Sequence, residues 1–160
     1  MNSQTLNALR DFPDKLEAFY TEVPAALKNW HPASWDGIPS EPFTAIEQIC
    51  HVRDIEIEGY HVRFRRTLDE VNPELASIDS IKVTNERDYA NANVADVFAS
   101  LKKARAETIA LLSSLTPQQL DRAAVFEGPT TLRGLAHYLC SHDQQHLSGL
   151  QWLLAKMEGR

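Results

Sequence analysis

Four stretches of this sequence place apolar residues at helical spacing, and this pattern limits the possible folds more than any other feature. They run from about residue 4 to 28, 44 to 69, 94 to 115 and 131 to 157. In each stretch apolar side chains recur every third or fourth residue, so they line one face of a helix. No part of the chain alternates apolar and polar residues as a half-buried strand does. Because each helix has to bury its apolar face against the others, we predict an all-α four-helix bundle.

Proline and capping residues indicate where these helices begin and end. Pro13 and Pro24 are expected to kink or divide the first helix. Thr44, followed three residues later by Glu47, forms a capping box at the start of the second helix. The polar stretch 71–93 is expected to be a long loop with a turn or two of helix between helices two and three. Such a loop can join helices that are parallel or not adjacent.

Size and charge exclude several classes of protein. At 160 residues, the chain is expected to form one domain over residues 1–160. The net charge of -6 is spread along the chain without a basic stripe, so nucleic acid is not an expected partner. The sequence shows neither a secretory signal nor an apolar run of about 18 residues, so we expect a cytoplasmic protein without a membrane segment. Cys50 and Cys140 are expected to be reduced, small apolar residues.

Two histidines of the last helix share its apolar face. With about 100° per residue, His142 and His146 fall in the same arc as the core leucines, one turn apart. Burying two imidazoles without partners costs on the order of several kcal/mol, a cost that a shared metal ion removes. An i, i+4 histidine pair supplies two ligands to one metal and requires one or two more from a facing helix. Ordinary hydrogen-bonded histidines are the alternative interpretation.

The third ligand is expected from helix two, which offers His51 and His61. These residues are separated by about 80° around the helix axis and about 15 Å along it, so only one can join a compact site. His51 lies in the most apolar part of the helix and is the better candidate. His61 is expected to be partly exposed, near Glu58 or Asp54. The remaining histidines, His31 in the proline-rich connection and His137 on the polar arc of the last helix, are not expected to bind the ion.

Two carboxylates of helix two, Asp54 and Glu58, are placed close to the face of His51 by the helical spacing. Either could orient a ligand histidine, and Glu58 is a weak candidate for proton transfer. The alternative is that both are solvated charges that pair with the arginines of HVRDIEIEGYHVRFRR.

The segments AIEQICHVRDIE and TLRGLAHYLCSHDQQHLSGL, the tryptophan-containing connection and the long loop together resemble the DinB-like (DinB/YfiT-like) superfamily of metalloenzymes. The likeness spans nearly the whole chain. It implies four helices running up, down, down and up, metal ligands at His51, His142 and His146, and a homodimer. Many relatives carry a glutamine shortly after the second histidine of the pair, whereas this chain has Ser148-Gly149.

Three neutral imidazoles leave coordination positions for water or a small-molecule substrate. We expect one divalent ion, with zinc or nickel first and iron as a further candidate. The resemblance implies, as the first hypothesis, a metal-dependent S-transferase or isomerase acting on a low-molecular-weight thiol. The second hypothesis is a metal-dependent hydrolase, with Glu58 as proton carrier. The third is a noncatalytic, stress-linked protein that binds metal or a small ligand.

Overall fold

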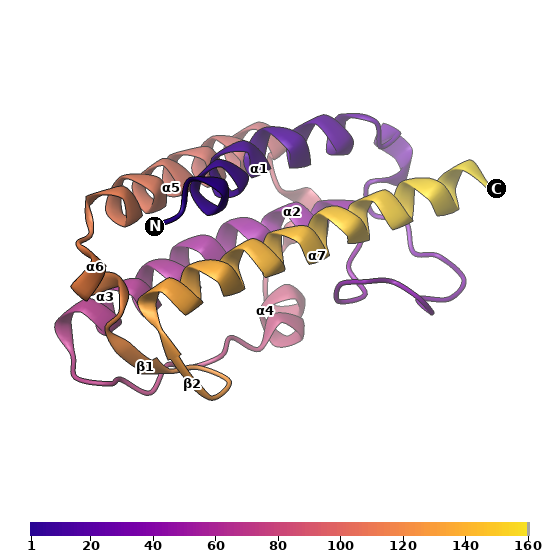
Figure 1. Ribbon diagram of the computed structural model, residues 1–160. Coiled ribbons are helices and arrows are strands. Elements are labelled where there is room, and N and C mark those ends of the chain that lie inside the picture. Colours follow the sequence, from indigo (N-terminus) through magenta and orange to yellow (C-terminus); the bar gives the residue numbers. More distant parts are fainter. Residues whose placement is uncertain (160) are drawn as a thin grey trace.

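The computed structural model describes residues 1–159 of the chain. Its framework is four long helical rods, as predicted (Figure 1). They are α1 (Ser3–Thr21), the continuous series α2 (Ala45–Asp54), η2 (Ile55–Tyr60) and α3 (His61–Asp69), α5 (Val94–Ser114) and α7 (Leu132–Glu158). The second rod changes from α-helix to π-helix at η2 and back again. The four-helix bundle is therefore confirmed.

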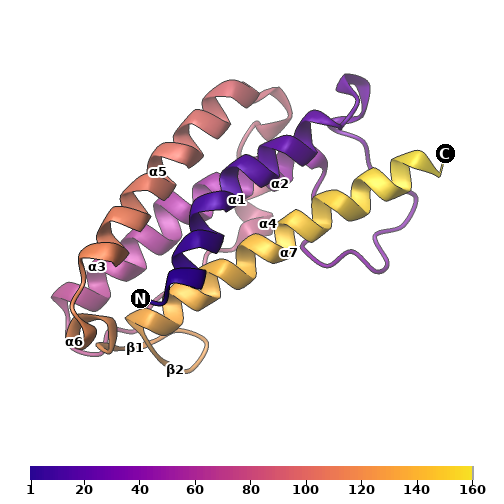
Figure 2. The same ribbon diagram turned by 45° about the horizontal axis from the view of Figure 1, so that its top comes forward.

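The direction of the rods also agrees with the expected topology. In Figure 1, α1 and α7 run one way, and the α2–α3 rod and α5 run the other way, which gives the order up, down, down, up. Helix α1 packs against α5 and α7, and α2 packs against the same two helices from the other side. The view in Figure 2 shows α1 and α7 running alongside each other. The long connection after α3 returns the chain along the bundle and contains α4 (Ser80–Glu86) and a 3-10 turn, Tyr89–Asn91.

The first helix is shorter than the sequence predicts. It ends at Thr21 and is followed by a separate 3-10 turn, Ala25–Leu27. Pro24 precedes that turn and disfavours a helical conformation in the residue before it, so the expected helix to residue 28 is divided there. Pro13, in contrast, lies inside α1. The capping box of α2 is present: Thr44 and Glu47 each bind the backbone N–H of the other.

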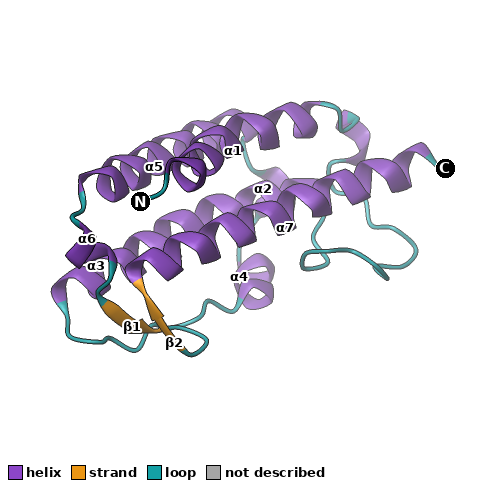
Figure 3. Ribbon diagram, in the orientation of Figure 1, coloured by secondary structure: helices purple, strands orange, loops and turns teal. Residues whose placement is uncertain are grey.

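A small hairpin was missed by the sequence analysis. After the short helix α6 (Pro117–Leu120), β1 (Ala123–Val125) pairs antiparallel with β2 (Pro129–Thr131) (Figure 3). Glu127 and Gly128 turn the chain with φ of 54° and 119°. Strands of three residues are too short to show an alternating pattern. The hairpin holds the long loop in place, because Val125 exchanges backbone hydrogen bonds with Pro73 and Leu75.

Apolar side chains from all four rods fill the interior, and the buried ones include Leu9, Phe12, Leu16, Ile49, Phe64, Leu101, Leu112, Leu135 and Leu150. Complete burial of each contributes about 1.5 to 3 kcal/mol. Both cysteines are free thiols; Cys50 is buried in this core. Among residues 1–159, no helix has the length and apolar character needed to cross a membrane.

Candidate metal centre

Three imidazole rings meet inside the bundle, where α2 faces α7. The ring of His51 lies with its centroid 5.2 Å from that of His142 and 4.5 Å from that of His146, and the last two are 4.4 Å apart. His51 and His146 are 2% and 0% exposed, and His142 is partly buried. Each residue offers one ring nitrogen such that all three nitrogens lie within 4.8 Å of one another. The structure thus brings the three histidines chosen from the sequence together.

The distances suit a shared cation. The Nε2 atoms of His51 and His142 are 3.1 Å apart. Two nitrogens that each lie about 2.0 to 2.1 Å from one metal ion are separated by about 2.8 to 3.0 Å in octahedral and about 3.3 to 3.4 Å in tetrahedral coordination. These two atoms are therefore already at the spacing that binding a common ion requires.

The hydrogen bonds of His146 show which of its nitrogens is available. The amide nitrogen of Gln48 donates to Ser40 Oγ at 2.8 Å and to the carbonyl of Phe43 at 3.3 Å, which fixes the amide orientation. The amide oxygen then lies 2.5 Å from His146 Nδ1, so Nδ1 carries the proton and donates. This leaves a lone pair on Nε2, which is buried and has no hydrogen-bond partner within residues 1–159. A buried, unpartnered lone pair is the expected state of a metal ligand.

All three histidines are neutral at neutral pH. Burial lowers the pKa of His51 to about 4 and holds the pKa values of His142 and His146 well below the usual 6.5. Repulsion from the neighbouring imidazoles lowers the pKa values of His142 and His146 further, as do the charges of Arg105 and Arg63 for His142, whereas the charge of Asp54 raises the pKa of His51. Because neutral imidazole is the form that binds metal, little proton competition is expected at this site.

Aromatic side chains restrict the rings. Phe43 stacks on His146 with an interplanar angle of 12° and packs on His51 at a centroid distance of 5.1 Å. Tyr60 packs on His142 at 6.3 Å. These contacts limit rotation of the imidazoles, so little ordering is required when an ion binds.

The departure from the family pattern at Ser148-Gly149 has a structural counterpart. A Cβ atom at Gly149 would clash with Ser40 Oγ and lie 2.9 Å from Gln48 Nε2. The missing side chain therefore leaves room for an amide from α2, and this amide binds His146. A glutamine is present beside the site, but it is supplied by the facing helix.

The two carboxylates proposed beside His51 lie elsewhere. Glu58 accepts a hydrogen bond of 2.9 Å from Arg87 and is about half exposed. Asp54 binds Arg53, Arg87 and the hydroxyl of Tyr89. The turn of η2 is wider than an α-helical turn, so the residues after Asp54 are rotated relative to the regular helix that we assumed. Glu58 thus pairs with Arg87 and forms no hydrogen bond with His51 within residues 1–159.

The other histidines do not join the site. His61 was expected near Glu58 or Asp54, but its Nε2 lies 3.1 Å from the carbonyl oxygen of Ala104 and 3.0 Å from Thr108 Oγ1 on α5. His137 is exposed on α7. His31 is exposed too, and its ring packs on that of Trp35.

A buried ionic network next to the site was missed by the sequence analysis. Arg105 donates to Glu56 and to Asp143, and all three residues are at most 2% exposed. Asp143 follows the ligand candidate His142 directly. The helical wheel contains the signal: at about 100° per residue Asp143 falls about 20° from Leu132, at the centre of the apolar arc. A carboxylate there requires a buried partner.

A cavity of about 350 Å³ lies beside the metal centre. His142 forms part of its wall, and Glu41 lies between the cavity and the centre, with its Oε2 3.5 Å from His146 Nε2. Glu41 was also missed, because it lies in the proline-rich connection, where no helical spacing applies. The other polar lining residues include Arg63, Ser77, Ser80, Glu127, Ser141 and Gln145.

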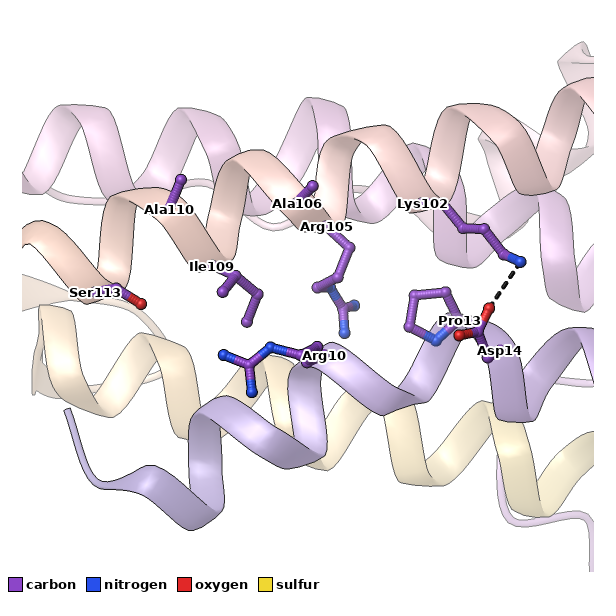
Figure 4. Close-up of a pocket in the computed structure, with 9 residues that line it drawn as sticks. All are labelled: Arg10, Pro13, Asp14, Lys102, Arg105, Ala106, Ile109, Ala110 and Ser113. Atoms are coloured by element: carbon purple, nitrogen blue, oxygen red, sulfur yellow. Dashed lines mark ion pairs between the residues drawn. The ribbon is translucent and has the colours of Figure 1, made fainter.

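A second cavity, of about 410 Å³, lies between α1 and α5, away from the histidines (Figure 4). Its cationic side chains have protein partners: Lys102 pairs with Asp14, and Arg105 belongs to the buried network. No histidine, cysteine or glutamate lines it. The cavity at His142 is therefore the better candidate for a substrate site.

Comparison with known proteins agrees with this architecture. YfiT from Bacillus subtilis, described as "a probable metal-dependent hydrolase with an unusual four-helix bundle topology", superposes with a TM-score of 0.85. The alignment covers 99% of this chain and 90% of that one at 19% sequence identity, which shows a shared fold. No curated protein sequence matches the chain significantly. The family model of the DinB superfamily matches residues 8–149, and the chain therefore belongs to the DinB superfamily.

Proposed function

We propose that this protein is a metal-dependent hydrolase whose divalent ion is bound by His51, His142 and His146. The observation that supports it most is the convergence of three neutral imidazoles, one of which, that of His142, lines a cavity. Three protein ligands leave a position for water or substrate, as in catalytic rather than structural sites. The description of YfiT as a probable metal-dependent hydrolase supports hydrolysis as the first proposal, ahead of the thiol hypothesis.

A bound divalent ion would polarise a carbonyl group and lower the pKa of water, which supplies a nucleophile near neutral pH. The side chains of this chain then have distinct tasks. Gln48 holds the His146 ring with its Nε2 turned toward the other two rings. Phe43 and Tyr60 cover the imidazoles and limit the access of bulk water.

We assign proton transfer to Glu41 in place of Glu58. Its carboxylate lies 3.5 Å from His146 Nε2, lines the cavity and is 37% exposed, so it can exchange protons with solvent. In this proposal Glu41 accepts a proton from the attacking water while the oxygen bonds to the acyl carbon. When the bond to the leaving group breaks, Glu41 returns the proton to that group.

The test begins with elemental analysis of protein purified without an affinity tag. Metal-free protein is then loaded with zinc, nickel or iron(II) and assayed with a panel of activated esters and amides. His142→Ala is expected to lose both metal and turnover, whereas His137→Ala, an exposed histidine on the same helix, retains both. Glu41→Gln is expected to retain the metal and lose turnover. Wild-type protein that cleaves no substrate faster than His142→Ala, with any of the three ions, rejects the hydrolase.

The same preparations test the thiol transferase. Bacillithiol, mycothiol or glutathione is added with an electrophile that reacts with thiols. Acceleration that depends on His142, in the absence of any hydrolysis, would replace the hydrolase with a transferase. The metal centre would keep its role in both cases.

A further inference from the structure

Arg63, on α3, is a buried cation without an acidic partner. It is 5% exposed, and within residues 1–159 no carboxylate lies at ion-pair distance from it. One terminal nitrogen donates to the carbonyl of Ala76 at 3.1 Å, and its Nε is buried with no hydrogen-bond partner. Burial lowers the pKa of Arg63, but an arginine remains charged at neutral pH.

Its surroundings contain aromatic rings and open space. The guanidinium carbon lies 4.2 Å from the ring centroid of Phe126 and 4.9 Å from that of Tyr60. Cation–π contacts offset part of the cost of burial, but they do not satisfy an N–H group. The carboxylate of Glu127 raises the pKa of Arg63 through its charge, yet it is exposed in the hairpin turn and forms no ion pair with it.

The second buried arginine provides a contrast. Arg105 is 2% exposed and is satisfied by two carboxylates, Glu56 and Asp143. Burying an arginine without such partners is unfavourable, because the charge loses its hydration. The two carboxylates offset this penalty at Arg105. The uncompensated cation is thus confined to the wall of the cavity.

Arg63 and the metal centre share this cavity. Both Arg63 and His142 line the space of about 350 Å³, and the Tyr60 ring packs against both. Three serines, Ser77, Ser80 and Ser141, add neutral hydroxyl groups to the wall. A small molecule in the cavity therefore meets the guanidinium of Arg63 and the imidazole of His142 together.

Gly59 makes room for this arrangement. A Cβ atom at this position would lie 3.1 Å from a terminal nitrogen of Arg63, tighter than an ordinary contact. An alanine there would force the guanidinium to move.

We propose that the cavity binds a small substrate with an oxyanion, of which a carboxylate is the best fit, and that Arg63 binds this group. The planar guanidinium can donate to a carboxylate through two parallel N–H groups. The substrate bond to be cleaved then faces the three histidines. This last part rests on the proposed hydrolase function, whereas anion binding does not.

The experiment measures binding to metal-free protein by calorimetry, so that neither turnover nor a metal contributes. The probes are N-acetylglycine, the neutral N-acetylglycinamide and inorganic phosphate. Wild-type protein is expected to bind the acid at least tenfold more tightly than the amide. Arg63→Gln is expected to abolish this preference, and Gly59→Ala to weaken it. Arg65→Gln, which removes an exposed arginine of the same helix, is the control and retains it.

Equal binding of acid and amide by the wild type, or equal binding of the acid by wild type and Arg63→Gln, overturns the proposal. If Arg63→Gln does not fold, Arg63→Lys is tested instead. Lysine keeps the positive charge but lacks the parallel N–H donors of the guanidinium, so it is expected to lose most of the preference for the acid over the amide. Phosphate bound more tightly than the acid, and dependent on Arg63, supports the oxyanion site and identifies a phosphorylated ligand. If the protein binds the acid but hydrolyses no ester, the hydrolase proposal is rejected and the anion site is kept. If it hydrolyses neutral esters but does not bind the acid more tightly than the amide, the anion site is rejected and the hydrolase is kept.

Discussion

The guanidinium of Arg105 on α5 donates two hydrogen bonds to the carboxylate of Asp143 on α7, at 2.7 and 3.0 Å. A second pair of bonds joins it to Glu56 on η2. Arg105 also donates to the carbonyl of Leu9 on α1 at 2.7 Å. All four rods are thus connected in the core, and the connection ends beside the ligand candidate His142. The network fixes how α7 lies against its neighbours, and with it the position of the metal centre.

Replacing Arg105 with methionine is expected to lower the free energy of unfolding by about 3 to 5 kcal/mol, because it leaves two buried carboxylates without a cationic partner. Urea denaturation measures the loss. Lys102→Met is the control on the same helix. It removes an exposed ion pair with Asp14 and Glu17 and is expected to cost at most about 1 kcal/mol. Similar losses in the two variants would show that the network contributes no more than a surface pair.

Replacing Gln48 with alanine is expected to weaken metal binding about 10- to 100-fold, because His146 loses the acceptor that fixes its tautomer and orientation. Competition with a chromophoric chelator gives the affinity. Gln145→Ala, an exposed position one residue before the ligand, is expected to bind as the wild type does. An unchanged affinity in Gln48→Ala would mean that Phe43 alone is enough to orient the ring.

Metal binding is expected to stabilise the fold, since the three nitrogens converge only in the folded chain. At a free metal concentration of 100 times Kd, the gain is about 2.7 kcal/mol. For a chain of this size, that corresponds to a rise in Tm of about 5 to 10 °C. Thermal unfolding with and without a chelator measures it, and His142→Ala is expected to show no rise. A rise of equal size in that variant would place the ion elsewhere.

The sequence predicts those features of the fold and the site that depend on residues close together along the chain. The helices and the arc shared by His142 and His146 follow from local spacing, and the capping box at Thr44 follows from two neighbouring residues. The choice of His51 over His61 also agrees with the placement of its ring. Each of these features depends on residues within a few helical turns.

Features that depend on tertiary contacts were not predictable in this way. Gln48 reaches His146 only because Gly149 lacks a side chain, a fact that involves two separate helices. The π-helical turn η2 was not predicted, since a regular helix was assumed. Glu41 lies in an irregular connection without periodicity. Arg63 resembled a surface arginine in HVRFRR, and only the fold shows that it is buried without an acidic partner.

The two free thiols are expected to differ in reactivity. Burial raises the pKa of Cys50 from 9.0 to about 12 and that of Cys140 to about 11. Because the thiolate is the reactive form, alkylation of native protein at pH 8 is expected to be slowed about a thousandfold at Cys50 and about a hundredfold at Cys140, relative to the unfolded chain. Iodoacetamide labelling followed by peptide mass spectrometry, with and without urea, measures both rates.

The same shift at Cys50 predicts the direction of the pH dependence of stability. Below pH 9 the thiol is protonated in both states, so stability does not depend on it. Between pH 9 and about 12 the unfolded chain releases the proton while the folded chain retains it, so the free energy of unfolding falls as pH rises. Cys50→Ala removes this contribution and is expected to show a smaller decrease over that interval than the wild type. Equal decreases, together with native labelling of Cys50 as fast as in urea, would mean that α2 opens readily at this position, beside the ligand candidate His51.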